Sequence, residues 1–153
     1  MFGRSLVILL ALCGILVAEQ VAANIQTTSA SESQVVVYYF HRTSRCHSCL
    51  TIEANIDDAL KAHFADALDD GSLLWLPTNT EEPENAHFEE DFSLEFSSAV
   101  LVRLDGKKVI SWTNLEKVWD LLENKEEFLV YIQQAVGSAL SGESKEQDTQ
   151  KQH

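Results

Sequence analysis

The sequence has few cysteines, and this scarcity excludes one class of fold. Its 153 residues contain three, namely Cys13, Cys46 and Cys49. Small secreted proteins that lack a sufficient core depend on dense disulfide frameworks, which so few cysteines cannot form. The chain must therefore be stabilised by a hydrophobic core, and its length suits one domain.

Basic residues are also scarce, with 11 Lys and Arg against 24 Asp and Glu and a formal net charge of −13. A field of this sign repels nucleic-acid phosphates and anionic lipid surfaces. The sequence has no Gly-rich phosphate loop and no Ser/His/Asp arrangement that would indicate nucleotide or hydrolase chemistry. We therefore predict no nucleic-acid partner and no cofactor.

The apolar run from Leu6 to Val17 is shorter than the roughly 20 residues that span a bilayer. Arg4 precedes it and a small-residue pattern ending at Ala23 follows, as is typical of a secretory signal peptide. We predict that residues 1–23 are a signal peptide and that the protein is extracytoplasmic, without stable membrane insertion. If the segment were not cleaved, it would anchor the protein to the membrane.

Two further segments are polar and have no apolar period. We predict that residues 24–34 are a flexible linker and that residues 141–153 are a disordered tail. The domain itself is expected over residues 35–140.

Within the predicted domain, residues 35–40 are all β-branched or aromatic, which indicates a central strand covered on both faces. An amphipathic helix with apolar positions from Ile52 to Leu68 follows. The later elements are predicted as a strand at 73–76, a helix that starts at Thr80 with a stripe of Phe88, Phe92 and Phe96, strands at 99–104 and 109–112 around the Asp105-Gly106 turn, and a closing helix over 115–140. We expect Trp75, Trp112 and Trp119 in the core.

This β-α-β-α-β-β-α order predicts an α/β protein with a central mixed β-sheet flanked by helices. With a C-x-x-C motif directly after the first strand, it is the order of a thioredoxin-like three-layer fold.

The C-x-x-C motif, Cys46 and Cys49, opens the first predicted helix. This spacing brings the two sulfurs within disulfide reach, with Cys46 as the exposed nucleophile and Cys49 as the resolving thiol. Unpaired N–H groups and the positive dipole end of a helix stabilise a thiolate there, which lowers the thiol pKa below its free value of about 8.5.

Positive charge is gathered around the motif, because residues 34–50 contain no Asp or Glu but do contain His41, Arg42, Arg45 and His47. We therefore expect Arg45 and His47 to favour the Cys46 thiolate, which moves a dithiol towards the oxidising end of the redox scale. The predicted function is an exported thiol-disulfide oxidoreductase or dithiol redox carrier, whose partner is a protein dithiol or disulfide.

Three alternative functions stay open. Cys46 and Cys49, with His41, could bind a soft metal ion or arsenite. The pair could instead be a purely structural disulfide. The chain could also be a non-catalytic interaction subunit whose acidic surface contacts a partner.

Several segments together resemble a bacterial family, the thioredoxin-like nitrophenyl compound nitroreductase subunit ArsF, found with arsenic-resistance operons. The segments that carry the resemblance are Val37-Tyr38-Tyr39-Phe40-His41, Arg45-Cys46-His47-Ser48-Cys49 and Thr51-Ile52-Glu53-Ala54. The resemblance implies an exported dithiol protein, in the bacterial periplasm, connected with redox or metalloid handling.

The sequence departs from thioredoxins proper in two places. Where they carry a cis-proline that faces the cysteines and keeps metals out, this chain has Ser97-Ser98-Ala99. Where they carry a buried acid on the first strand, this strand has none. The first departure favours metal or metalloid binding at Cys46 and Cys49.

Overall fold

The computed structural model describes residues 33–142, so the predicted signal peptide and nearly all of the linker and tail lie outside the described residues. The elements in this range are β1 (Ser33–His41), α1 (His47–His63), α2 (Ala65–Asp69), β2 (Leu73–Asn79), α3 (Phe88–Asp91), β3 (Ser98–Asp105), β4 (Lys108–Asn114), the 3-10 helix η1 (Glu116–Val118) and α4 (Lys125–Leu140). None of the described helices is long and apolar enough to cross a membrane.

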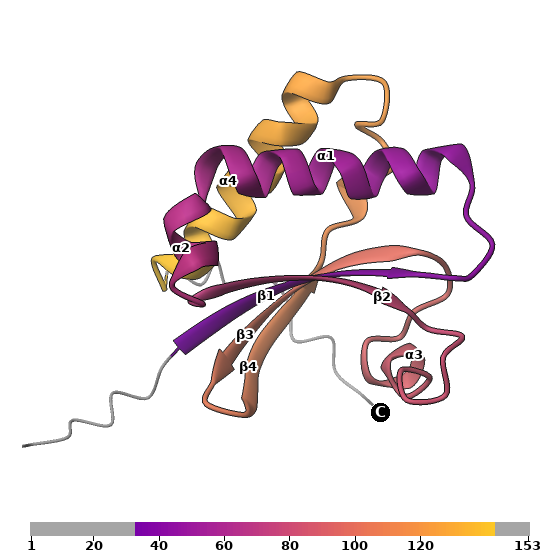
Figure 1. Cartoon of the computed structure of the whole chain (residues 1–153), viewed down its shortest axis with the longest axis horizontal. Coiled ribbons are helices and arrows are strands. Elements are labelled where there is room, and N and C mark those ends of the chain that lie inside the picture. The colour runs from indigo at the N-terminus through magenta and orange to yellow at the C-terminus, as the bar shows by residue number, and fades with distance from the viewer. Residues whose placement is uncertain (1–32, 143–153) are drawn as a thin grey trace, which may run out of the picture. The chain divides into compact units, whose positions relative to one another are not determined.

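The strands of this range form one mixed sheet in the order β2-β1-β3-β4. β1 is parallel to β2 and antiparallel to β3, and β4 returns antiparallel to β3. Figure 1 shows α1 and α4 on one side of the sheet and α3 on the other. The prediction of an α/β protein with a central mixed sheet and β1 inside it is confirmed, and the arrangement is compatible with a thioredoxin-like fold.

Alternate residues of the two inner strands enter two separate cores. Val37 and Tyr39 of β1 face α1 and α4, where they pack with Ile56 and Phe128. Val36 and Phe40 of β1 face the other side, where they pack with Val100, Val102 and Phe92. Because a strand alternates its side chains between the faces of a sheet, an uninterrupted apolar strand such as β1 requires cover on both.

The helix predicted through Leu68 is interrupted. α1 ends at His63, Phe64 has a non-helical backbone, and the separate short helix α2 completes the segment. Gly71 then adopts a positive φ of 79°, a conformation that glycine tolerates without strain, and the chain turns into β2.

The prediction of a helix that starts at Thr80 is wrong for most of that helix's length. The chain from Asn79 to Phe88 makes successive turns, in which the N–H groups of Glu82, Asn85 and Phe88 donate to carbonyls three residues earlier. Only the four residues of α3 are helical, and Ser93 ends them with a φ of 51°. Of the three phenylalanines in the predicted stripe, only Phe92 is buried. Because short helices depend on tertiary packing for their stability, this is too little burial to extend α3.

Three other expectations also need correction. The closing helix is divided, because η1 and a series of turns precede α4, whose first turn is capped by the Asn124 side chain. Phe96 is 58% exposed and does not continue the aromatic stripe. Trp112 is 42% exposed because it lies on β4, the edge strand, where no further strand or long helix covers it.

Candidate functional site

The two cysteines lie where β1 leads into α1. β1 ends at His41, a short segment crosses to the helix, and Cys46 is the residue that caps α1. The Cα atoms of Cys46 and Cys49 are 5.1 Å apart and their side chains form a disulfide. Cys46 is exposed, whereas Cys49 is 8% exposed. This is the arrangement expected for an accessible first sulfur and a sheltered second one.

The Cys46 side chain acts as the N-cap of α1. The backbone N–H of Cys49 donates a hydrogen bond of 3.1 Å to Cys46 Sγ, and Cys46 has the extended backbone that a cap requires. The first turn of α1 contains no acidic residue. The sulfur therefore lies at the positive end of the helix dipole, without a carboxylate in that turn to oppose it.

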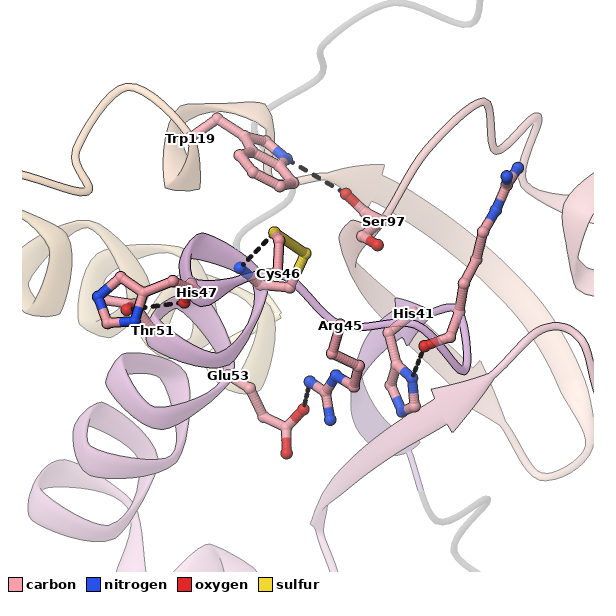
Figure 2. Close-up of a disulfide and its surroundings, with 10 residues drawn as sticks. His41, Arg45, Cys46, His47, Thr51, Glu53, Ser97 and Trp119 are labelled. Carbon is pink, nitrogen blue, oxygen red and sulfur yellow. Dashed lines mark hydrogen bonds and ion pairs between the residues drawn. A yellow bond between two sulfur atoms is a disulfide. The ribbon is translucent and has the colours of Figure 1, made fainter.

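Arg45 does not direct its charge at the sulfurs. Its Nη2 pairs with Oε2 of Glu53 on α1, and its Cζ lies 5.8 Å from the ring centroid of Tyr39 on β1. Figure 2 shows the Arg45 side chain turned away from the disulfide and towards Glu53. The charge of Arg45 is therefore paired with Glu53, a residue outside the acid-free stretch, and its expected effect on the Cys46 thiolate stays a prediction.

The two histidines also lie differently from the expectation. His47 is exposed, and Figure 2 shows its ring on the outside of α1, away from the disulfide. His41 Nδ1 is 3.1 Å from the carbonyl oxygen of Arg42. Within residues 33–142, no three His, Cys, Asp or Glu side chains are grouped so that they could hold a metal ion. The alternative ligand set of Cys46, Cys49 and His41 is thus not grouped in this arrangement.

Tyr39 is a buried polar side chain beneath the start of α1. It is 0% exposed, and its hydroxyl has no hydrogen-bond partner among the described residues. Burial raises the pKa of Tyr39 to about 12, although the nearby Arg45 acts against this shift. On the strand where thioredoxins carry a buried acid, this protein therefore holds a neutral phenol.

The segment before β3 forms the opposite wall of the site. The indole Nε1 of Trp119 donates to the carbonyl oxygen of Ser97 at 3.2 Å, and Figure 2 shows both residues beside the disulfide. Phe96 packs edge-on against Trp119, with 6.1 Å between the ring centroids. Trp119 is half-buried and supports the segment whose sequence departs from that of thioredoxins.

A shallow, open depression with a cavity volume of only about 10 Å³ lies near this wall, lined by residues that include His41, Arg42, Glu89, Phe96 and Ser97. Pockets that enclose drug-sized ligands have volumes of about 300–1,000 Å³. This depression is smaller and open, so it suits a surface contact with a larger partner better than enclosure of a small substrate.

Glu53 and Trp119 were not among the site residues predicted from the sequence. Glu53 follows Cys49 by four residues, which is one helical turn, and this spacing could have indicated that its carboxylate lies on the cysteine face of α1. Trp119 is distant in sequence from the motif, and only the return of the chain after β4 brings it to the disulfide.

No protein-family model matches the chain, and no curated protein matches it. A solved structure titled "Structure of a malarial protein" aligns with a TM-score of 0.36 and 18% sequence identity, over 53% of this chain and 80% of that chain. A likeness of this size carries no argument about fold or function. The interpretation of the site therefore depends on its own geometry.

Proposed function

We propose that this protein is a thioredoxin-like thiol-disulfide oxidoreductase or dithiol carrier. The observation that supports this most directly is the Cys46–Cys49 disulfide at the first turn of α1, with an exposed Cys46 whose Sγ accepts the N–H of Cys49. Hydrogen bonds to sulfur and a helix N-terminus favour the thiolate, which is the form that attacks disulfides.

The proposed exchange proceeds in two steps. In the reduced protein, the Cys46 thiolate attacks a partner disulfide, forms a mixed disulfide and releases one partner sulfur as a thiolate. Cys49, after losing its proton, attacks Cys46 Sγ, restores the internal disulfide and releases the second partner sulfur. The partner gains two electrons and the Cys46–Cys49 pair loses two, and the reverse sequence oxidises a partner dithiol.

The proposed fold follows from the order of elements, and the proposed family and location follow from the resemblance. The sheet order and the position of the motif support a thioredoxin-like fold. The resemblance around Cys46 and Cys49 favours the ArsF family, an arsenic-resistance context and a periplasmic location. These remain parts of the proposal.

A second candidate function is binding of trivalent arsenic, a thiophilic centre, by the two reduced sulfurs. The observation that favours it is the segment Ser97-Ser98-Ala99, which has serine and alanine where thioredoxins carry the proline that keeps metals out. Ser97 of this segment lies beside the disulfide in Figure 2.

The test is the reduction potential of the Cys46–Cys49 pair. The full chain carrying Cys13→Ser, so that only two thiols are counted, is equilibrated with chelator in glutathione buffers, and free thiols are trapped by alkylation. A protein that also carries Cys46→Ser and Cys49→Ser gives the blank. We expect a reversible transition above about −230 mV, the range of oxidising members of this fold.

A pair that stays oxidised below about −300 mV would indicate a structural disulfide and overturn the proposal in favour of an interaction subunit. The reduced protein is then titrated with arsenite without chelator. Stoichiometric binding with proton release, together with no exchange with protein disulfides, would favour the second function.

A further inference from the structure

Three side chains from three parts of the chain meet around the Arg45 guanidinium. Tyr39 comes from β1, Arg45 from the segment before α1, and Glu53 from the second turn of α1. The Arg45 and Glu53 side chains are only 20% and 27% exposed, and Arg45 Nε is buried without a hydrogen-bond partner among the described residues. The pair is therefore less screened by solvent than an ion pair on the surface.

Both charges of this pair are close to the cysteines along the chain. Arg45 directly precedes Cys46. Cys46, Cys49 and Glu53 follow one another at spacings of three and four residues, which places them on one face of α1. Removal of either charge should therefore change the electrostatic potential at the sulfurs, and the two removals should act in opposite directions.

Within residues 33–142, the other charged or titratable groups beside the motif form no ion pair. Those at the end of β1 and at the start of α1 are His41, Arg42 and His47, of which Arg42 and His47 are exposed. The opposite wall contributes Ser97 and Trp119, which carry no charge, and Glu89 and Glu95 line the depression near it. Among the described residues, Arg45–Glu53 is thus the ion pair of the site.

We propose that Glu53 is a positioning residue for the dithiol, which acts through Arg45. It holds the guanidinium against Tyr39 and balances its charge, so that the Cys46 thiolate receives less positive potential than residues 34–50 alone would supply. Glu53 thereby limits how oxidising the pair is. This inference rests on the proposed function, since it concerns the redox balance of the same dithiol.

The charge balance predicts the sign of each effect. Glu53→Gln leaves one uncompensated positive charge, which stabilises the thiolate and with it the reduced form. Arg45→Met leaves one negative charge, which favours the disulfide. The double variant is neutral again and should return close to the wild-type balance, whereas a purely structural pair would give shifts of the same sign or none.

The experiment measures the equilibrium of the dithiol with oxidised glutathione, which yields the protein disulfide and two molecules of reduced glutathione, in the Cys13→Ser background. We expect Glu53→Gln to shift the equilibrium constant towards the reduced dithiol by about tenfold, equal to about 30 mV for a two-electron couple. Arg45→Met should shift it in the opposite direction, and the double variant should lie within about threefold of the unmodified pair.

Asp58 and Lys125 form a matched control pair. They also join α1 to another part of the chain, with 2.7 Å between Nζ and Oδ2, but they are 54% and 57% exposed. Asp58→Asn and Lys125→Met should change the equilibrium constant by less than about twofold, because exposed pairs are strongly screened. A second readout is the pH dependence of Cys46 alkylation, whose midpoint should fall in Glu53→Gln.

Shifts of the same sign in Glu53→Gln and Arg45→Met, or shifts no larger than those of the control pair, would overturn the inference. If Arg45→Met does not fold, Glu53→Gln decides alone, because its shift towards the reduced form requires the carboxylate charge to act on the dithiol. A failure of the proposed function is distinct, since the unmodified pair would then show no reversible transition.

Discussion

The face of the sheet that carries α1 and α4, which we call the disulfide face, differs in burial from the face that carries α3, which we call the aromatic face. Ile56 of α1 and Phe128 of α4, the two long helices of the disulfide face, are 0% exposed. On the aromatic face, a cluster of rings that includes Phe88 and Phe92 extends to the exposed Trp112. The Cys46–Cys49 disulfide thus lies on the face that the two long helices cover.

Side chains packed by neighbouring helices have little freedom to move, so α1 presents Cys46 and Cys49 in one arrangement. The aromatic face has only four helical residues above it, and turns suffice there because nothing in it must position a sulfur.

The largest expected effect comes from the removal of one buried aromatic ring from each face of the sheet. Phe128→Ala should lower the free energy of unfolding by about 3–5 kcal/mol, the range for deletion of a buried ring. Phe92→Ala should cost at least about 1 kcal/mol less, because Phe88 and Trp112 are partly exposed and can close over the space. Urea unfolding of the oxidised chain measures both. An equal loss at Phe92 would show that the two faces are packed equally well.

The next largest effect is the loss of folding stability at high pH. Burial raises the pKa of Tyr39 on the disulfide face to about 12, from 10.0. Because the folded protein favours the neutral phenol, its stabilisation is complete below pH 10 and is lost as the pH rises towards 12, by roughly 2–3 kcal/mol for a shift of two units. Tyr39→Phe should remove this part of the pH dependence, as followed by urea unfolding between pH 9 and about 12.

Tyr38 provides the matched control on the aromatic face. Burial also raises its pKa, but Tyr38 is only half-buried. Tyr38→Phe should therefore remove less of the alkaline loss than Tyr39→Phe does. The opposite ranking would contradict the difference in burial between the faces.

Local sequence patterns were sufficient for the elements that bury continuous apolar surface. The central strand β1, the helix after it and the hairpin at Asp105-Gly106 each follow from short-range periodicity or turn chemistry. The motif at the start of α1 was predicted for the same reason, since a helix beginning and a C-x-x-C spacing are both local.

The errors arise where a partner distant in sequence, or the lack of one, decides the outcome. Arg45 looked like free positive charge because its neighbours in sequence are not acidic, yet Glu53 reaches it from the second turn of α1. Trp112 has the apolar character of a core residue, but β4 is an edge strand. The start at Thr80 has good helix-capping residues and too little apolar surface to continue.

A smaller effect is expected from reduction of the disulfide. The Cys46–Cys49 bridge closes a very short loop, so chain entropy allows it to stabilise the folded state by at most about 2 kcal/mol. The disulfide face should therefore remain folded when the pair is reduced, as the proposed function requires. Urea unfolding of the oxidised and reduced forms measures the difference, with the Cys46→Ser, Cys49→Ser protein as the control. A loss above about 4 kcal/mol would mark the bridge as structural.

The smallest effect compares two tryptophans. Trp119→Phe removes the hydrogen bond to the Ser97 carbonyl beside the disulfide, which should cost about 1 kcal/mol, the net value of such a bond in a partly buried place. Trp112→Phe, on the exposed edge strand, should stay within about 0.5 kcal/mol of the unmodified protein. Thermal unfolding resolves this difference. If Trp112→Phe were the more harmful change, the edge strand would contribute more to stability than its exposure indicates, and the contrast between the two faces would be weaker than the burial of their rings suggests.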